Sequence, residues 1–254
     1  MTIAILREVS SSLGRCELTH IARETLDVGV ARAQHRAYEK ALRMLGCSIL
    51  MLPEEPELPD AVFVEDTAII LPELAIITRP GALSRRAETA TVAAALARYR
   101  PLAEIRSPGT IDGGDVLVAG KELFVGESKR TNNEAIEQLG ALLRGHGYTV
   151  RSIPLNGCLH LKSAATLRGD DLLLVNPAWV DPALFGRRSV IEVDPSESYA
   201  ANALWLGGGI IYPGAFPRTR ERLAARGNRP HTIDLSELAK AEGAVTCCSL
   251  IVGL

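Results

Sequence analysis

Short apolar runs alternate with amphipathic stretches along the whole chain. Segment 63–99 reads as a strand, a tight turn, a second strand, a loop with Pro-Gly and then an amphipathic helix. Segment 110–147 repeats that order, and comparable patterns run over 160–185 and 199–227. The pattern therefore predicts an α/β protein built from similar units of two strands and one helix.

A fifth unit is divided between the two ends of the chain. Residues 246–254 supply one strand, whereas "TIAILREVS" near the N-terminus and the helical pattern 28–45 supply the remainder. The unit starts near 63, 110, 160, 199 and 246 are 47, 50, 39 and 47 residues apart. A ring closed by the first and last strands would give such spacing, although strand–helix alternation also fits a doubly wound sheet.

Each unit carries polar or reactive residues on what reads as its first strand. They are Glu65 with Asp66, Asp112 with Asp115, His160, Asn202 and Cys247. In a ring, equivalent positions on equivalent strands meet at the axis. Distant segments would then deliver carboxylates, an imidazole and a thiol to one small pocket, which is what a nucleophilic site requires.

Two cysteines adjoin in the run "TCCSLIVGL", at Cys247 and Cys248. Neighbouring side chains on a strand point to opposite faces, so only one thiol is expected to face the axis. Alternation alone does not say which. His160 is the only histidine on an apolar strand pattern, which singles it out as a partner for the thiol. A small buried cysteine and a hydrogen-bonded core histidine are the alternatives.

Acidic residues gather around the predicted thiol. "LPDAVFVEDTAII" contains Asp60, Glu65 and Asp66, and "TIDGGDVLV" adds Asp112 and Asp115. Strand-embedded acids are costly unless they are paired or functional. Through like-charge repulsion they would raise the pKa of a thiol, which suits a nucleophile only if the substrate is itself a cation. A guanidinium would pair with the carboxylates and favour the thiolate.

Composition excludes several classes of partner. The 254 residues are 47% hydrophobic and 23% charged, with a formal net charge of −2, which argues against nucleic acid or an anionic membrane as the main partner. Five scattered cysteines do not suggest a disulfide framework, and no apolar run approaches a membrane span. The basic clusters at 84–88 and 217–229 read as solvated helix faces. We therefore expect one catalytic domain over residues 1–254, in the cytoplasm.

Seven motifs resemble those of the dimethylarginine dimethylaminohydrolase family, in the same order and over essentially the whole chain. They are "PDAVFVED", "ITRPGALSRR", "TIDGGDVL", "VGESKRTN", "LHLKS", "AAN" and "TCCS". This family belongs to the guanidino-group-modifying pentein superfamily. The resemblance implies a five-bladed α/β propeller of ββα-type repeats around a pseudo-fivefold axis. It also implies hydrolysis of asymmetric dimethylarginine and monomethylarginine to citrulline and dimethylamine or methylamine.

The same resemblance implies catalytic roles. Cys247 would be the nucleophile and would form a covalent thiouronium intermediate. His160 would act as general acid and then as general base, with Asp112 as its supporting carboxylate. This chemistry needs no metal and no cofactor. Bound zinc is expected to inhibit by capturing Cys247 and His160.

The substrate-binding residues implied by the resemblance form three groups, according to the part of the substrate they would hold. They are Asp66 and Glu65 for the guanidinium, Asp60 with the backbone carbonyls of Leu18 and Ala241 for the α-amino group, and Arg85 and Arg130 for the α-carboxylate. A guanidinium fork suits a carboxylate. Leu18 lies in "GRCELTH", where the family has a mobile lid.

Arginine deiminases and arginine amidinotransferases share this layout and are the nearest alternative. They typically have an Asp two residues after the catalytic His, where this chain has Lys162. The missing carboxylate leaves room for N-methyl groups. A non-catalytic propeller that only binds a partner is a further alternative, but it predicts no converging thiol, imidazole and carboxylate. The expected partner is thus a small molecule, and the chain could be a monomer or a homodimer.

Overall fold

Five three-stranded sheets of one design make up the computed structural model, which describes residues 2–207 and 209–253. The strands are β1 (Thr2–Arg7), β2 (Cys47–Leu52), β3 (Ala68–Ile70), β4 (Ala75–Ile77), β5 (Leu102–Glu104), β6 (Val116–Ala119), β7 (Glu122–Glu127), β8 (Thr149–Pro154), β9 (Ala165–Arg168), β10 (Leu172–Val175), β11 (Ser189–Glu192), β12 (Leu204–Leu206), β13 (Gly209–Pro213), β14 (Pro230–Ile233) and β15 (Leu250–Gly253). Their orders are β15-β1-β2, β3-β4-β5, β6-β7-β8, β9-β10-β11 and β12-β13-β14.

Helices connect the second strand of a sheet to the third. The α-helices are α1 (Val28–Met44), α2 (Thr89–Leu96), α3 (Asn133–Leu143), α4 (Leu161–Ala164), α5 (Pro217–Ala225) and α6 (Ser236–Ala239). The 3₁₀ helices are η1 (Leu13–Arg15), η2 (Val64–Thr67), η3 (Leu83–Glu88), η4 (Gly113–Asp115), η5 (Arg144–His146) and η6 (Pro182–Phe185). Four connections contain α1, α2, α3 or α5, and the connection from β10 to β11 contains η6.

Each unit has one strand more than the two predicted. In every sheet the first two strands are antiparallel, and the third, which follows the helix, runs parallel to the second. At least half of the residues are exposed in four of the third strands, β5, β8, β11 and β14. These four carry little hydrophobic periodicity, and the apolar run CSILML of β2 does not alternate, so the sequence did not reveal them.

The two ends of the chain complete one sheet. β1 lies between β15 and β2, antiparallel to the former, with Thr2 opposite Gly253, and parallel to the latter, with Thr2 opposite Cys47. The prediction that the fifth unit is split between the termini is therefore confirmed. Its helix, expected over 28–45, is α1. Asp27 caps it by accepting from the Val30 backbone N–H.

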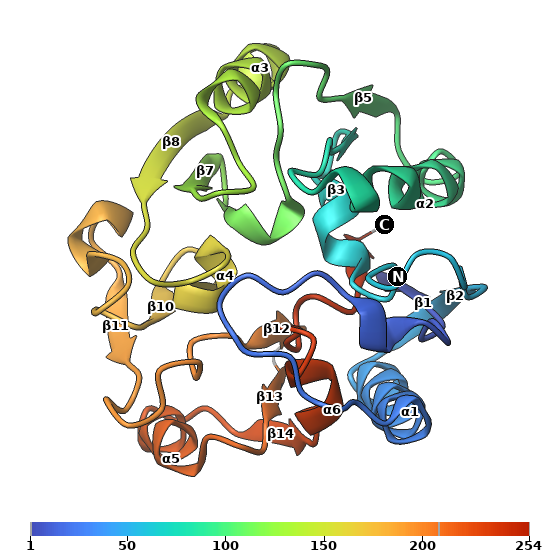
Figure 1. Ribbon diagram of the computed structural model, residues 1–254. Helices are drawn as coiled ribbons and strands as arrows, with labels where there is room; N and C mark the ends of the chain where they lie inside the picture. Colours follow the sequence, from blue (N-terminus) through green and yellow to red (C-terminus); the bar gives the residue numbers. More distant parts are fainter. Residues whose placement is uncertain (1, 208, 254) are drawn as a thin grey trace.

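The sheets follow one another around a common centre, with α1, α2, α3 and α5 on the outside (Figure 1). The buried face of α1 contains Ala31, Gln34, Tyr38 and Leu42, at the three- and four-residue spacing of a helix packed on one side. Among the described residues, no helix combines the length and apolar character needed to cross a membrane.

The turns before the first strands, not the strands themselves, carry the predicted reactive residues. Glu65 and Asp66 lie on η2 before β3, and Asp112 immediately precedes η4, ahead of β6. His160 is the residue before α4, ahead of β9, and Cys247 lies in a turn before β15. The placement of these residues on strands was therefore wrong, although equivalent positions of successive units do carry them.

Candidate active site

A cavity of about 20 Å³ lies where these turns meet. Its walls come from segments spread over most of the chain, and they contain Glu17, Asp60, Phe63, Asp66, Arg85, Arg130, Leu159, His160, Ala241, Glu242 and Cys247. We call it the central cavity. Seven of the predicted site residues line it. Leu18, Glu65 and Asp112 do not.

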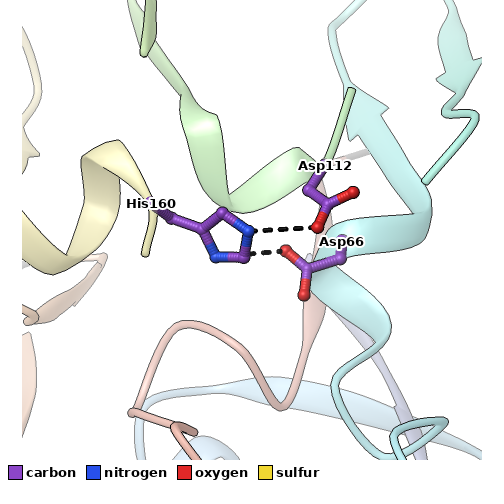
Figure 2. A group of neighbouring side chains, drawn as sticks. All are labelled: Asp66, Asp112 and His160. Atoms are coloured by element: carbon purple, nitrogen blue, oxygen red, sulfur yellow. Dashed lines mark hydrogen bonds and ion pairs between the residues drawn. The ribbon is translucent and has the colours of Figure 1, made fainter. Parts of the chain in front are cut away.

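Two carboxylates approach the imidazole of His160 from the same side (Figure 2). Its Nε2 lies 3.1 Å from Oδ2 of Asp112, and its Nδ1 lies 3.9 Å from Oδ1 of Asp66. Burial by itself lowers the pKa of His160, but Asp66, Asp115 and Asp112 outweigh it and raise the pKa to about 9. The ring is therefore an imidazolium at neutral pH.

Asp112 is fixed on its other side by backbone. Its Oδ1 accepts from the Gly81 N–H at 2.9 Å, and its side chain is fully buried. Asp112 thus reaches the central cavity only through His160, as a residue that orients the ring. The donor atoms of Asp66, Asp112 and His160 lie within 4.8 Å of one another, which is the spacing of a possible metal site. Cys247 is not part of that group, so zinc capture by Cys247 with His160 stays a prediction.

Two adjacent glycines allow this close packing. The Gly114 N–H donates to Oδ1 of Asp66 at 3.0 Å. A Cβ at position 114 would lie 2.7 Å from Nδ1 of His160, and a Cβ at position 113 would lie 2.0 Å from the Glu65 carbonyl oxygen. The "GG" of "TIDGGD" is therefore required by close approach of the backbone to the site.

Arg85 is buried between acidic groups and is not on the solvated helix face suggested by its basic cluster. Its Nη1 lies 2.6 Å from Asp66, its Nη2 lies 2.8 Å from Glu88, and Nη2 also donates to the Phe63 carbonyl. Burial raises the pKa of Asp66, but His160 and Arg85 outweigh it and lower the pKa to about 2. Asp66 is thus a permanent anion at the cavity wall.

Arg130 reaches the cavity from the second unit. It is only half-buried, and its Nη2 donates to Oγ1 of Thr19 at 3.1 Å. Protein groups engage the guanidinium of Arg85 on several sides, whereas the described partner of Arg130 is a hydroxyl. The structure therefore brings both predicted carboxylate-binding arginines to one cavity. The guanidinium of Arg85 is already paired with carboxylates there, whereas that of Arg130, among the described residues, is not.

Cys247 and Cys248 do separate, but a turn rather than strand alternation separates them. Cys247 lines the central cavity, and its carbonyl accepts from the Glu65 N–H at 3.1 Å. Cys248 is fully buried in the apolar cluster that includes Tyr38 and Leu42. Burial, followed by Glu65 and Asp66, raises the pKa of Cys247 well above its usual range. The thiol is therefore protonated at neutral pH.

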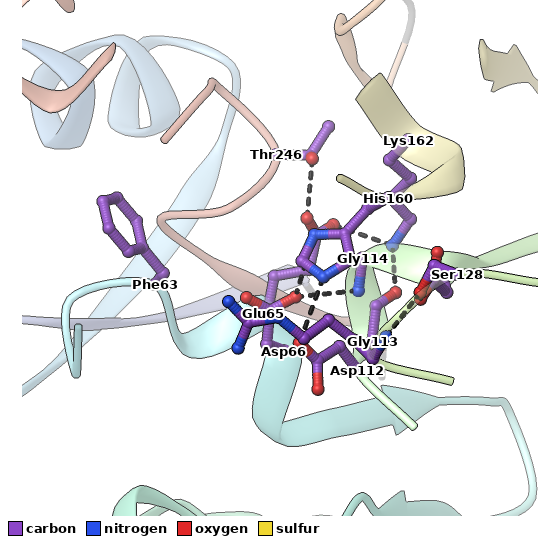
Figure 3. Close-up of polar contacts among 12 residues, drawn as sticks. Phe63, Glu65, Asp66, Asp112, Gly113, Gly114, Ser128, His160, Lys162 and Thr246 are labelled. Atoms are coloured by element: carbon purple, nitrogen blue, oxygen red, sulfur yellow. Dashed lines mark hydrogen bonds and ion pairs between the residues drawn. The ribbon is translucent and has the colours of Figure 1, made fainter. Parts of the chain in front are cut away.

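Glu65 does not line the central cavity, and its side chain lies beside Lys162 and Thr246 (Figure 3). It accepts from Nζ of Lys162 at 2.7 Å and from Oγ1 of Thr246 at 2.6 Å. Lys162 also donates to the Gly113 carbonyl at 3.1 Å, and Asn202 donates to Thr246 at 3.0 Å. These hydrogen bonds involve one residue from each of the five units. They therefore link the five units to one another beside the cavity.

Four residues that line the cavity were not predicted: Glu17, Phe63, Leu159 and Glu242. Phe63 and Leu159 are neighbours of the motif residues, so their position could have been read from the motifs. Glu17 and Glu242 lie in segments with no periodic signal, and only the fold brings them together. Leu18 is half-buried and packs against the apolar cluster that contains Cys248.

Comparison with known proteins gives consistent matches. Residues 35–202 match the family model described as arginine deiminase. The chain is 39% identical over 226 residues to a dimethylarginine dimethylaminohydrolase of Pseudomonas aeruginosa, covering 88% of this chain and 89% of the relative. It is 40% identical over 249 residues to a protein of the same name from Streptomyces coelicolor, covering 97% and 95%.

Solved structures agree with these matches. A cysteine-to-serine mutant of the Pseudomonas aeruginosa enzyme, complexed with citrulline, superposes with a TM-score of 0.94 at 37% identity, and 98% of each chain is covered. The N-terminal domain of a cyanobacterial arginine dihydrolase superposes with a TM-score of 0.88 at 18% identity, covering 99% of this chain and 98% of that one. At that identity, the second match shows a shared fold only.

Proposed function

Since this chain belongs to the dimethylarginine dimethylaminohydrolase family, we propose that it hydrolyses Nω-methylated arginines to citrulline and methylamine or dimethylamine. One observation carries the proposal: a protonated thiol, an imidazolium and a permanent carboxylate, those of Cys247, His160 and Asp66, line one small buried cavity. The cations of His160 and Arg85 leave the thiol protonated, and a guanidinium substrate would bring a further positive charge to the sulfur.

The first half of the reaction forms a covalent intermediate. The bound guanidinium pairs with Asp66 and favours loss of the Cys247 proton to water, because its positive charge stabilises a thiolate. The sulfur attacks the guanidinium carbon and forms a C–S bond. His160 donates its proton to the departing nitrogen, the C–N bond breaks, and dimethylamine or methylamine leaves a thiouronium on Cys247.

The second half releases the product. His160, now neutral, takes a proton from a water molecule that attacks the thiouronium carbon. The tetrahedral intermediate collapses, the C–S bond breaks with its electron pair returning to sulfur, and citrulline is formed. Asp112 holds the ring through Nε2 in both halves, so the same imidazole serves as acid and then as base.

Substrate positioning is proposed from the remaining cavity residues. Asp60, together with the carbonyls of Leu18 and Ala241, would bind the α-amino group, and Arg130 with Arg85 would bind the α-carboxylate. Asp60 and Ala241 support this as cavity residues. The role proposed for Glu65 differs from the direct guanidinium contact that the sequence predicted. Its carboxylate supports the site electrostatically from behind the cavity, paired with Lys162.

We further propose that the five sheets form a five-bladed α/β propeller and that residues 1–254 are a single catalytic domain. The arrangement of the sheets around one centre, and the sheet shared by both ends of the chain, support this. A cytoplasmic location is part of the same proposal and depends on the odd, scattered set of cysteines.

The test is turnover by the purified protein of asymmetric dimethylarginine, monomethylarginine and arginine, measured as citrulline formed. We expect kcat/KM for the methylated substrates to exceed that for arginine by at least about tenfold, a difference of about 1.4 kcal/mol in transition-state binding. Ammonia release from arginine at a comparable rate would instead favour a deiminase. That alternative has support in the family model, which is described as arginine deiminase.

A further inference from the structure

The second acid of the motif "TIDGGDVLV", Asp115, has no step in the proposed reaction. Its side chain is fully buried at the last residue of η4, and it does not line the central cavity. Burial raises the pKa of Asp115 to about 6, so the group is an anion at neutral pH. A buried anion is costly unless polar groups satisfy it, so the hydrogen bonds to its two oxygens indicate its role.

Oδ1 of Asp115 supports the turn that carries the imidazole. The Leu161 N–H donates to this oxygen at 3.0 Å. Leu161 is the first residue of α4, and His160 directly precedes it. The first N–H groups of a helix have no partner within the helix, and Asp115 supplies one. The carboxylate therefore fixes the backbone from which the His160 ring extends.

Oδ2 of Asp115 supports the loop that carries Arg130. It accepts from Oγ of Ser128 at 2.5 Å and from Oγ1 of Thr131 at 2.6 Å. Oγ of Ser128 accepts in turn from the backbone N–H groups of Arg130 at 3.0 Å and Thr131 at 3.2 Å. A hydroxyl that gives its single proton to a carboxylate presents its lone pairs to these N–H groups. The backbone at Arg130 is thus tied to Asp115 through one hydroxyl.

Thr131 extends these contacts to Asp112. Its Oγ1, which donates to Asp115, also accepts from the Asp112 N–H at 3.3 Å. The side chain of Asp112 in turn lies 3.1 Å from Nε2 of His160. Asp115 therefore supports the imidazole along a second route, which does not pass through Leu161.

The neighbouring strand leaves room for this carboxylate. A Cβ at Gly126 of β7 would lie 2.8 Å from Oδ1 of Asp115 and 2.9 Å from Cβ of Leu161. A side chain at this position would displace the acid or the start of α4, so the close approach requires glycine. Packing and hydrogen bonds together therefore hold the carboxylate of Asp115 in one place.

We propose that Asp115 is a positioning residue that fixes the general acid His160 and the substrate-binding Arg130 relative to each other. One oxygen supports the backbone beside His160, and the other supports the backbone at Arg130 through Ser128. A substrate whose α-carboxylate lies on Arg130 then presents its departing nitrogen to the imidazole at the distance that proton transfer requires. The kinetic consequence rests on the proposed function, whereas the support of the two residues does not.

Hydrogen–deuterium exchange of the substrate-free protein tests the support of both residues. In Asp115→Asn the side chain keeps its shape, but an NH₂ group replaces one acceptor oxygen and the charge is lost. We expect the amides of Arg130 and Leu161 to exchange at least about threefold faster, because a carboxylate is the stronger acceptor. Ser128→Ala should speed exchange at Arg130 and leave Leu161 unchanged. Unchanged exchange at Arg130 in both variants, or at Leu161 in Asp115→Asn, would overturn the proposal.

Steady-state kinetics on asymmetric dimethylarginine separate the two sides of the carboxylate. Asp115→Asn should lower kcat by at least about tenfold and raise KM by at least about threefold, because both residues lose support. Ser128→Ala keeps the carboxylate, so it should raise KM by a similar factor and change kcat by less than about threefold. Asp170→Asn, at an exposed position, is the matched control and should change neither constant. An unaltered kcat in folded Asp115→Asn would contradict the proposal, as would an unaltered KM in Ser128→Ala.

The pH–rate profile distinguishes this role from one in stability alone. Burial lowers the pKa of His160, but Asp66, and after it Asp115, raise it. The alkaline limb of kcat/KM should therefore move to lower pH in Asp115→Asn and stay in place in Ser128→Ala. A limb that stays in place in Asp115→Asn would also overturn the proposal. If the unsubstituted protein does not turn over methylarginines but exchange responds as expected, the proposed function fails and the positioning by Asp115 stands.

Discussion

Nζ of Lys162 lies 2.7 Å from Oε1 of Glu65, although 97 positions separate the two residues in the chain. Lys162 occupies the position at which the sequence resemblance places an acid in arginine deiminases. The pair therefore does two things. It pairs the largely buried carboxylate of Glu65 with a cation, and under the proposed function it leaves no second carboxylate beside the guanidinium.

Breaking this pair should be costly. Both side chains are largely buried, so Lys162→Met leaves the Glu65 carboxylate without its cation, and we expect a loss of about 3 kcal/mol in the free energy of unfolding. Lys162→Met with Glu65→Gln should recover part of that loss, because no charge is then left unpaired. Urea denaturation of both variants measures it. Equal stability of the single and double variants would contradict a buried-charge penalty.

The two adjacent cysteines should respond differently to substitution. Cys247→Ser should lower kcat by at least about a thousandfold, since a hydroxyl is a far weaker nucleophile in this site. Cys248→Ala should keep kcat within about threefold and lose roughly 1 kcal/mol of stability, because its thiol packs in the apolar core. Mass spectrometry of the peptide that contains both residues, after quenching during turnover, should place the thiouronium on Cys247. An adduct on Cys248 would reverse the assignment.

The activity should have an alkaline limit set by His160. Its pKa of about 9 means that the general acid is lost as the pH rises through 9, so kcat/KM should fall there. Asp112→Asn removes a carboxylate that raises this pKa, and the alkaline limb should then move to lower pH. A pH–rate profile of both proteins measures the shift. An unmoved limb in Asp112→Asn would mean that another group titrates.

The same ionisation affects stability. The folded pKa of about 9 exceeds the ordinary value of 6.5, so the charged ring stabilises the fold fully below pH 6.5. That contribution is lost as the pH rises through 9. Thermal melts of the unsubstituted protein and of His160→Gln, taken at pH 6 and pH 9.5, should therefore converge at the higher pH. An equal difference in melting temperature between the two proteins at pH 6 and at pH 9.5 would contradict this prediction.

Close packing at Gly114 should tolerate no side chain. In Gly114→Ala the new Cβ would lie 2.7 Å from Nδ1 of His160 and 2.8 Å from Oδ1 of Asp66, so the ring must shift. We expect a loss of about 2 kcal/mol in stability and a fall of about a hundredfold or more in kcat. Gly140→Ala is the matched control, because a Cβ there meets nothing within 4 Å on helix α3. It should stabilise by about 0.5–1 kcal/mol and leave kcat unchanged.

Local pattern was enough to predict the repeat. Apolar alternation and helical periodicity marked the first two strands of the units, helix α1 and the unit split between the ends, because each of these buries one face over a continuous stretch. The third strands escaped notice because four of them are half or more exposed and the apolar run of β2 does not alternate. Seven residues to which the family resemblance assigned roles line one cavity, and those roles stay predictions.

The directions of the site side chains were decided by tertiary structure alone. The sequence determined that a thiol, an imidazole and several acids recur at equivalent places in successive units. It did not determine that 3₁₀ turns carry Glu65 and Asp66, that Cys247 rather than Cys248 faces the cavity, or that Glu65 turns to Lys162. Periodicity describes which face of an element is apolar. The direction of a side chain in a turn depends instead on partners about a hundred or more residues away, which only the packed fold brings within hydrogen-bond distance.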